Sequence, residues 1–280
     1  MNDTYDIDEL CAALDVPRSS YYAHRRATRH PGARCQADAA LKLQIAAAFE
    51  RSGRTYGAPR IQYELRTEGR PVPARKRIAR LMRGLGLNAR PRRHYRVKTT
   101  DSNHCGPIAP NRLLDRPAPS RTNEVWRSDI TYVRTGEGWL YLCAFKDAYS
   151  RRQIGWAMSA QIDTALVLAA LDMAIASRRP QPGLIVHTDR GSQYASAAYR
   201  AALARIGATP SMSRRANCYD NAAMESAWSS LKLERVYREH YATHAQARAS
   251  IHDYLCFYNR KRRHSSLGYL SPIDFENQSN

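Results

Sequence analysis

The order of strand-like and helix-like segments between residues 123 and 234 constrains the fold more than any other feature. Three strand-like stretches come first: EVWRSDITYV, WLYLCAFKDA and RRQIGWAMS. They are followed by the helical stretch DTALVLAALDMAIA, the buried-strand sequence GLIVHTD, a short helix near 197–206, the strand ATPSMS and a helix from about residue 220. Three neighbouring antiparallel strands followed by alternating helices and strands predict an α/β unit, a mixed sheet with flanking helices.

Residues 36–98 carry a different pattern, in which apolar residues recur at helical spacing. Helices are expected over about 38–49, from Pro59 to Gly69, and from about Pro73 onward. Their inward-facing residues are Leu41, Ile45, Ala48, Phe49, Ile61, Leu65, Ile78, Leu81, Met82 and Leu85. We interpret this segment as a small all-α domain. Residues 1–35 form a helical lead-in, for which the expected anchors are Leu10, Leu14, Tyr21 and Tyr22.

The charge of the chain indicates an anionic partner. The formal net charge is +19, and residues 70–98 contain eleven Lys or Arg and no acidic residue. Two short helices, the second of them densely basic, suggest a helix-turn-helix that contacts DNA, although a solvated helical hairpin with a basic tail has the same pattern. The residues expected at DNA phosphates are Arg75, Lys76, Arg77, Arg80 and Arg83, with Arg260, Lys261, Arg262 and Arg263 near the C-terminus.

A segment with four prolines and no apolar period, residues 99–122, is expected to be a linker. The domains predicted from the sequence are therefore 1–35, 36–98, the linker 99–122, and an α/β core over 123–280 that ends in a basic helix and tail. No signal peptide or membrane span is recognisable, which favours the cytoplasm. The six cysteines are scattered without a paired-ligand motif, so a structural zinc site is not expected.

Three carboxylates are the candidates for catalysis. Asp129 lies inside the first strand, where an unpaired charge is costly. Asp189 follows the apolar strand 184–186, at a strand end where α/β folds commonly place ligand sites. Glu225 lies early in the last predicted helix, and the 35 residues between Asp189 and Glu225 are enough to bring the chain back beside its starting strand. Taken singly, each has an ordinary alternative as an ion-pair partner, a turn residue or a solvated helix residue.

Carboxylates that converge would repel one another unless cations lie between them. Oxygen ligands favour Mg²⁺ or Mn²⁺, and two such ions would serve in-line displacement at a phosphate. Lys232 lies seven residues after Glu225, about 20° around the helix, and so faces the same side. We expect Lys232 to contact DNA beside the metal site, and the alternative is a surface ion pair with Glu225 or another acid.

Several longer motifs resemble one known family. WRSDITYVRT, HTDRGSQY, SMSRRANCYDNAAMESAWSSLKLE and FYNRKRRHSSLGYLSPIDF are similar to the second-frame transposases of the IS-three group of bacterial insertion sequences. The segment RTYGAPRIQYELRTEG resembles that family's helix-turn-helix. The likeness extends from about Cys35 to Phe275, nearly the whole chain.

The resemblance implies a ribonuclease H-like integrase core that cuts DNA 3′ ends in a Mg²⁺-dependent reaction and joins them to a target. By motif, Asp129, Asp189 and Glu225 match the first, second and third catalytic carboxylates. The family also implies DNA ends as substrate, an upstream first-frame protein as partner, and a homo-oligomer on DNA. Ala216 stands where the family typically has Gly, which would add about 1 kcal/mol of strain if the loop needs a positive φ.

Two other functions remain open from the sequence. One is a ribonuclease H-like nuclease that hydrolyses DNA without joining it. The other is a catalytically idle, transposase-derived DNA-binding regulator, against which the three intact carboxylates argue.

Overall fold

The computed structural model describes residues 6–30, 32–69, 73–89, 106–114, 116–214 and 221–279. The chain divides into two compact units, Met1–Ala89 and Arg90–Asn280. Ala216 and the basic stretch 90–98 lie outside the described residues.

The N-terminal unit is helical, as predicted. Its helices are α1 (Ile7–Ala13), α2 (Arg18–Arg29), α3 (Ala33–Arg51), α4 (Ala58–Thr67) and α5 (Arg75–Gly84). The apolar faces of α3, α4 and α5 form its interior, and they bury the residues predicted from periodicity: Leu41, Ile45, Ala48, Phe49, Ile61, Leu65, Ile78, Leu81 and Met82.

Two expectations for this unit are wrong. Leu85 follows the last residue of α5 and is 37% exposed, because the helix ends before that position turns inward. Leu10, Leu14 and Tyr22 do not anchor the lead-in, since they are exposed, and the buried apolar residue of α1 is Cys11.

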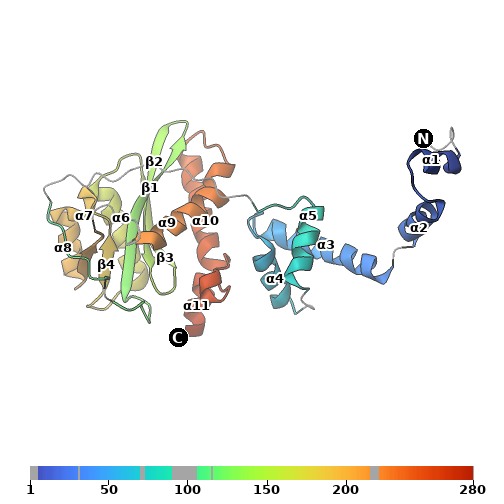
Figure 1. The fold of residues 1–280 in the computed structure, drawn as a ribbon. Coiled ribbons are helices and arrows are strands. Elements are labelled where there is room, and N and C mark those ends of the chain that lie inside the picture. The colour runs from blue at the N-terminus through green and yellow to red at the C-terminus, as the bar shows by residue number, and fades with distance from the viewer. Residues whose placement is uncertain are drawn as a thin grey trace. The chain divides into compact units, whose positions relative to one another are not determined.

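The second unit is built on a five-stranded sheet, seen nearly edge-on in Figure 1. Its strands are β1 (Val125–Thr135), β2 (Gly138–Asp147), β3 (Gln153–Ser159), β4 (Ile185–Thr188) and β5 (Thr209–Met212), in the order β3-β2-β1-β4-β5. The first three strands pair antiparallel, whereas β4 runs parallel to both β1 and β5. The mixed sheet predicted from the sequence is confirmed.

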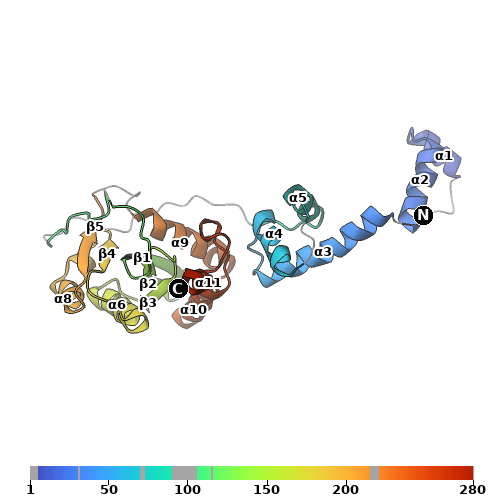
Figure 2. The ribbon, with the colours of Figure 1, turned by 90° about the horizontal axis from the view of Figure 1, so that it is seen from below.

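Helices cover both faces of this sheet (Figure 2). On one face lie α6 (Thr164–Arg178), α7 (Ser192–Ala195) and α8 (Ala197–Arg205), packed on an interior that includes Trp126 and Phe145. Asp163 caps α6 by accepting a hydrogen bond from the Leu166 amide, as expected. At Gly155 of β3, a Cβ would overlap the α6 backbone, so glycine allows α6 to lie close to the sheet.

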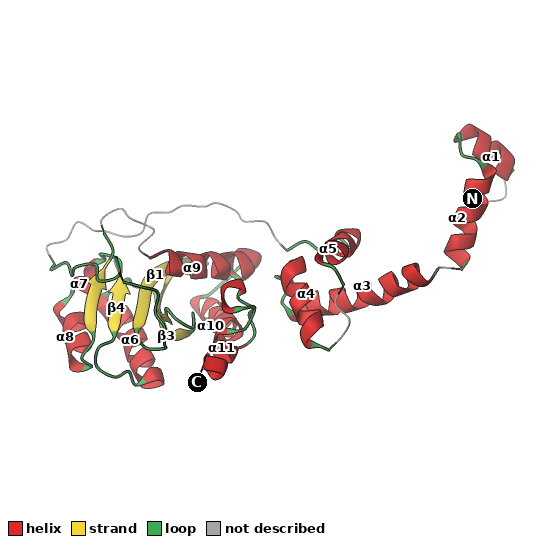
Figure 3. Ribbon diagram, turned by 60° about the horizontal axis from the view of Figure 1, so that its bottom comes forward, coloured by secondary structure: helices red, strands yellow, loops and turns green. Residues whose placement is uncertain are grey.

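The other face carries α9 (Ala222–Glu234) and α10 (His244–Arg260), which pack on Leu140, Leu142 and Ala144 of β2. The short helices η2 (Val236–Arg238) and η3 (Ser265–Leu267) follow α9 and α10, and α11 (Pro272–Ser279) ends the chain (Figure 3). Glu276 of α11 is paired with Arg178 of α6 and with Arg152. Within the described ranges, no helix is long and apolar enough to cross a membrane.

The segment expected to be a linker belongs partly to this unit. The Arg112 amide donates a hydrogen bond to Ser211 Oγ on β5, and Ala109 packs against the core. This packing could not be predicted from the proline-rich sequence, which has no apolar periodicity. The packing depends on a backbone hydrogen bond and one small side chain, and not on a repeating apolar face.

Candidate active site and DNA-contact residues

Asp129 lies in the middle of β1, on the face covered by α9. The indole Nε1 of Trp228 donates a hydrogen bond to Asp129 Oδ2 at 3.0 Å, and the Ile130 amide donates to Oδ1 at 2.9 Å. Asn221, at the start of α9, donates to the Ser128 carbonyl of the same strand at 3.3 Å. The carboxylate is therefore oriented by its own strand and by α9.

Asp189 follows the last residue of β4. Because Arg127 of β1 is in register with His187 of β4, Asp129 and Asp189 each lie two positions further along these parallel neighbours. Both line a pocket of about 230 Å³ whose other walls are Ile130, Tyr132, Tyr141, Ile162 and Gly191–Tyr194. The structure therefore brings the first two predicted carboxylates to one site.

Gly191 lets the chain turn closely around Asp189. Its amide donates a hydrogen bond to Asp189 Oδ1 at 3.0 Å, and a Cβ at this position would lie 3.1 Å from the same oxygen. That distance is tighter than most contacts of real Cβ atoms, so a larger residue would press on the carboxylate. This part of HTDRGSQY thus fixes the orientation of Asp189.

Glu225 lies in the first turn of α9, the helix that also supplies Trp228, and its side chain is exposed. The charge of Glu225 raises the pKa of Asp129, but less than the charge of Asp189 does. Among the described residues, no three His, Cys, Asp or Glu side chains are grouped closely enough to hold a metal ion. The structure brings two carboxylates together and leaves the third on the adjoining helix.

The electrostatics of this site favour a cation. Burial raises the pKa of Asp129 to about 8; Asp189 and, more weakly, Glu225 push in the same direction, while the hydrogen bonds from Ile130 and Trp228 oppose the rise. A carboxyl group that holds its proton near neutral pH, because it is buried and lies near other carboxylates, would be stabilised as an anion by a divalent ion. The oxygen-only donor set fits Mg²⁺ or Mn²⁺.

Lys232 lies along the same helix, above the sheet. Its Nζ is 4.6 Å from the centroid of the Tyr132 ring, a cation–π distance. Burial lowers the pKa of Lys232, and the charge of Asp129 opposes that shift. Within the described residues Lys232 makes no ion pair with Glu225, so the ordinary surface pair considered from the sequence is not formed.

The basic residues of α5 divide into two groups. Arg75, Lys76 and Arg83 are exposed. Arg77 and Arg80 instead pair with Asp38 of α3, each at 2.6 Å, while remaining more than one third exposed. Asp38 therefore neutralises part of the charge of this helix, and its own pKa is lowered by the hydrogen bonds from Arg80 and Arg77.

The basic cluster at the end of α10 also divides. Arg260 and Lys261 are exposed and Arg263 is half-buried. Arg262 is only 5% exposed, and its guanidinium donates to both carboxylate oxygens of Glu234, at 2.7 and 2.8 Å, and to Ser230 Oγ. The expectation that Arg262 contacts DNA is corrected, because reaching a phosphate would require breaking this buried pair.

Sequence reasoning missed several side chains that define the site. Trp228 packs in the core under α9, yet its indole also donates to Asp129. Its position three residues after Glu225 was the available signal, because residues three apart share a helix face. Tyr132 and Tyr141, which line the pocket, carried no signal beyond alternation along the strands.

Comparison with known proteins agrees with this architecture. Residues 119–218 match an integrase core domain model, residues 206–272 match a second one, and residues 36–95 match an HTH-like domain. An uncharacterized 31 kDa protein of insertion element IS600 from Shigella sonnei is 44% identical over 267 residues, covering 95% of this chain and 97% of its own. Transposase InsF for insertion sequence IS3A from Escherichia coli (strain K12) is 41% identical over 276 residues, covering 98% and 95%.

The similarity to solved structures is lower than the similarity to these transposon-encoded proteins. The catalytic core domain of BIV integrase is 16% identical, with 56% of this chain and 95% of that chain covered and a TM-score of 0.44. The HTLV-2 integrase catalytic core domain in complex with magnesium is 13% identical, with 55% and 96% covered and a TM-score of 0.45. At these scores the likeness carries no argument of its own.

The fold and the family models define a polynucleotidyl transferase of the DDE type, an enzyme with a ribonuclease H-like integrase core and a dependence on divalent metal. More particularly, the chain belongs to the IS3 family of transposases, with an HTH-like domain before the core. The family and fold predicted from the sequence are confirmed.

Proposed function

We propose that Asp129, Asp189 and Glu225 are the catalytic carboxylates of this transposase and that they bind two Mg²⁺ or Mn²⁺ ions. The observation that carries this proposal is the shared pocket of Asp129 and Asp189, together with the influence of Glu225 on the Asp129 pKa. Bound there, the ions would activate the attacking oxygen and stabilise the leaving one. The reaction is cleavage at the 3′ ends of the element and transfer of those ends to target DNA.

The protein's own groups keep the carboxylates in position. Trp228 donates to Asp129 Oδ2 and the Gly191 amide donates to Asp189 Oδ1, so hydrogen bonds hold both carboxylates in fixed orientations. Because these donors lie on α9 and on the turn after β4, a shift of either element would misalign the site. Ser230 and Glu234 tie the other half of α9 to Arg262.

Lys232 would hold a DNA phosphate beside this site. Its ammonium lies on the Tyr132 ring next to Asp129, partly desolvated, so a phosphate would find a cation whose competing hydration is reduced. Arg75, Lys76, Arg83, Arg260 and Lys261 would contact DNA further away, mainly through phosphates. Arg77, Arg80 and Arg263 would add weaker contacts, because Asp38 or the backbone already engages them. We further propose action as a homo-oligomer on DNA with the element's upstream first-frame protein.

The test is cleavage and joining on a plasmid that carries both element ends, with and without the first-frame protein. Asp129→Asn, Asp189→Asn and Glu225→Gln should each lower product formation by more than a thousandfold while DNA binding persists. Asp172→Asn is the matched control, because Asp172 is an exposed acid on α6 away from the pocket. Retained cleavage in any of the three variants would remove that residue from the mechanism.

The same assay separates the alternatives. Sequenced products that are cut but never joined would favour a nuclease, and binding without cleavage by the native chain would favour a regulator. Lys232→Ala should slow joining about tenfold or more at low DNA concentration with little change in thermal stability. Normal joining by that variant at high salt would contradict the phosphate contact.

A further inference from the structure

A row of aromatic and cationic side chains crosses the end of the β1–β2 hairpin. Tyr132 and Trp139 meet edge to face, with ring centroids 5.0 Å apart and an interplanar angle of 87°. The Arg134 guanidinium lies 5.9 Å from the Trp139 ring centroid, and Lys232 lies 4.6 Å from that of Tyr132. We refer to Tyr132, Arg134, Trp139 and Lys232 as the hairpin platform.

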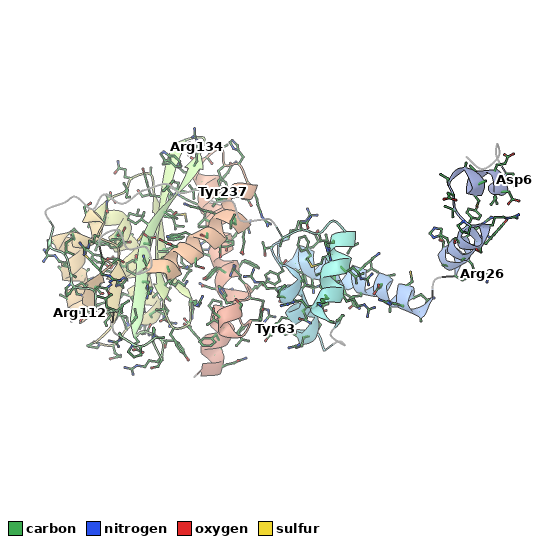
Figure 4. The ribbon with its side chains drawn as sticks, viewed as in Figure 1. Asp6, Arg26, Tyr63, Arg112, Arg134 and Tyr237 are labelled. Carbon is green, nitrogen blue, oxygen red and sulfur yellow. The ribbon has the colours of Figure 1, made fainter. Side chains whose placement is uncertain are left out.

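The platform begins at the candidate active site. Tyr132 pairs with Tyr141 across the hairpin, and Arg134 pairs with Trp139, so these four strand side chains lie on one face of β1 and β2. Lys232 reaches the Tyr132 ring from α9. Tyr132 and Tyr141 also line the pocket that contains Asp129 and Asp189. From these carboxylates the row therefore runs outward to the hairpin end, where Figure 4 labels Arg134.

The outer part of the platform is open to solvent. Trp139 is 46% exposed, whereas Trp126 is fully buried and Trp228 is 6% exposed. Arg134 is exposed as well, and the pocket-lining Ile162 is 37% exposed. Cross-strand pairing explains why Arg134 lies beside Trp139. It does not explain why a tryptophan side chain is almost half exposed to solvent close to the pocket that contains Asp129 and Asp189.

We propose that the hairpin platform binds unpaired DNA bases adjacent to the phosphate that is cut. Trp139 would stack on a base through its exposed surface, while Arg134 and Lys232 would neutralise the flanking phosphates. Inside a duplex both faces of each base are covered by its neighbours, so stacking on the platform favours unpaired nucleotides. This inference rests on the proposed function, because that function places the scissile phosphate in the pocket.

Equilibrium binding of the full-length chain tests the platform. The probes are a blunt DNA duplex and the same duplex with a short single-stranded extension that carries 2-aminopurine at successive positions. The native chain should bind the extended probe about tenfold more tightly than the blunt one, since one stacked base contributes roughly five- to a hundredfold. The fluorescence of at least one 2-aminopurine in the extension should fall on binding, because stacking on an aromatic ring quenches it.

Trp139→Ala should abolish both the preference for the extension and the quenching, with the affinity for blunt duplex unchanged. Trp139→Phe, which keeps an aromatic ring and the hairpin packing, should restore most of the preference. Arg205→Ala removes an exposed arginine at the end of α8 and is the matched control for Arg134→Ala. Arg134→Ala should weaken binding of the extended probe, whereas Arg205→Ala should not.

Three outcomes would overturn the platform: no quenched position in the native complex, an unchanged preference in Trp139→Ala, or loss of the preference in Trp139→Phe despite a native melting curve. Asp129→Asn separates this test from that of the proposed function. It should keep the preference for the extension while losing cleavage. If Asp129→Asn cleaves normally, the assignment of Asp129 as a catalytic carboxylate is wrong, whatever the binding experiments show for the hairpin platform.

Discussion

The two units of this transposase place their charged groups differently. Among the described residues of the N-terminal unit, Ser52 is the only buried side chain that is polar or charged. The catalytic unit instead buries Lys146, Asp147, Arg262 and Glu276. A basic residue in the first unit is thus a surface group, whereas one in the second can be part of the interior.

The buried charges of the catalytic unit join elements that are distant in the sequence. Lys146 of β2 donates to the Ala223 carbonyl in the first turn of α9, two residues before Glu225. Arg262 holds the other end of α9 through Glu234. Because burying a charge costs free energy unless it finds a partner, these groups favour one arrangement of α9 on the sheet. Among the described residues of the helical unit, Arg77 and Arg80 also join α5 to α3 through Asp38, but both arginines remain more than one third exposed.

The largest expected effect comes from replacing Arg262, and it tests whether the catalytic unit depends on a buried charge. Arg262→Ala should destabilise the catalytic unit by about 3 kcal/mol, because Glu234, whose side chain is only 12% exposed, would lose its guanidinium partner and keep the weaker hydrogen bond from the Tyr254 hydroxyl. Urea unfolding of the full chain followed by tryptophan fluorescence measures this, since Trp126, Trp139, Trp156 and Trp228 all lie in the catalytic unit.

Two controls sharpen the Arg262 measurement. Arg260→Ala removes the exposed neighbour and should change stability by less than about 0.5 kcal/mol. Adding Glu234→Gln to Arg262→Ala should recover part of the lost unfolding free energy, because the carboxylate charge of Glu234 is removed. Equal effects of Arg262→Ala and Arg260→Ala on stability would contradict a stabilising role for the buried charge of Arg262 in the catalytic unit.

Periodicity predicted the N-terminal unit almost completely, and Arg262 shows where the same reasoning failed. In α5 the charges alternate with Ile78, Leu81 and Met82 at helical spacing, so their outward direction could be predicted. The run Arg260–Arg263 carries no apolar period, because it spans the end of α10 and the turn after it. Nothing in four consecutive basic residues reveals which one meets Glu234.

For the active site, strand patterns located Asp129 and Asp189 on the sheet, while their roles came from the family motifs. The exposed position of Glu225 and the Trp228 hydrogen bond to Asp129 depend on how α9 lies against β1. That placement is fixed by tertiary contacts such as Lys146 with Ala223, which no local pattern encodes.

Lys146 gives a second, pH-dependent difference between the units. Burial lowers the pKa of Lys146 from 10.5 to about 7, with smaller contributions from Arg151, Arg127 and Arg262. Between these values the unfolded chain binds one more proton than the folded one at this residue. The Lys146 contribution to stability therefore rises with pH, by at most about 1.4 kcal/mol per unit, and its full cost is present below pH 7.

Lys146→Met should remove this dependence. The difference in unfolding free energy between Lys146→Met and the native chain should shrink steadily from pH 7 to pH 9.5, as the native lysine loses its proton. Taking the difference cancels groups common to both chains, including Asp129. Urea midpoints by tryptophan fluorescence provide the measurement, and parallel profiles for the two proteins would contradict a depressed Lys146 pKa.

The smallest expected effect concerns the exposed charges of α5, where the comparison predicts that DNA affinity changes and stability does not. Each phosphate contact contributes about 0.9 to the slope of log affinity against log salt. Replacing Arg75, Lys76 and Arg83 together by alanine should therefore flatten the slope by about 2 to 3. Replacing Arg77 and Arg80 should flatten it less, because Asp38 already neutralises part of their charge.

Arg262 provides the contrast for this salt titration. A conservative Arg262→Lys variant keeps the formal charge but loses the two-pronged contact with Glu234, so stability should fall while the slope stays as in the native chain. An unchanged slope for the Arg75, Lys76 and Arg83 variant would assign α5 to a solvated surface without DNA. A slope that responds to Arg262→Lys as strongly as to that triple variant would mean that the buried arginine also reaches DNA, and the division between surface and interior charges would not hold.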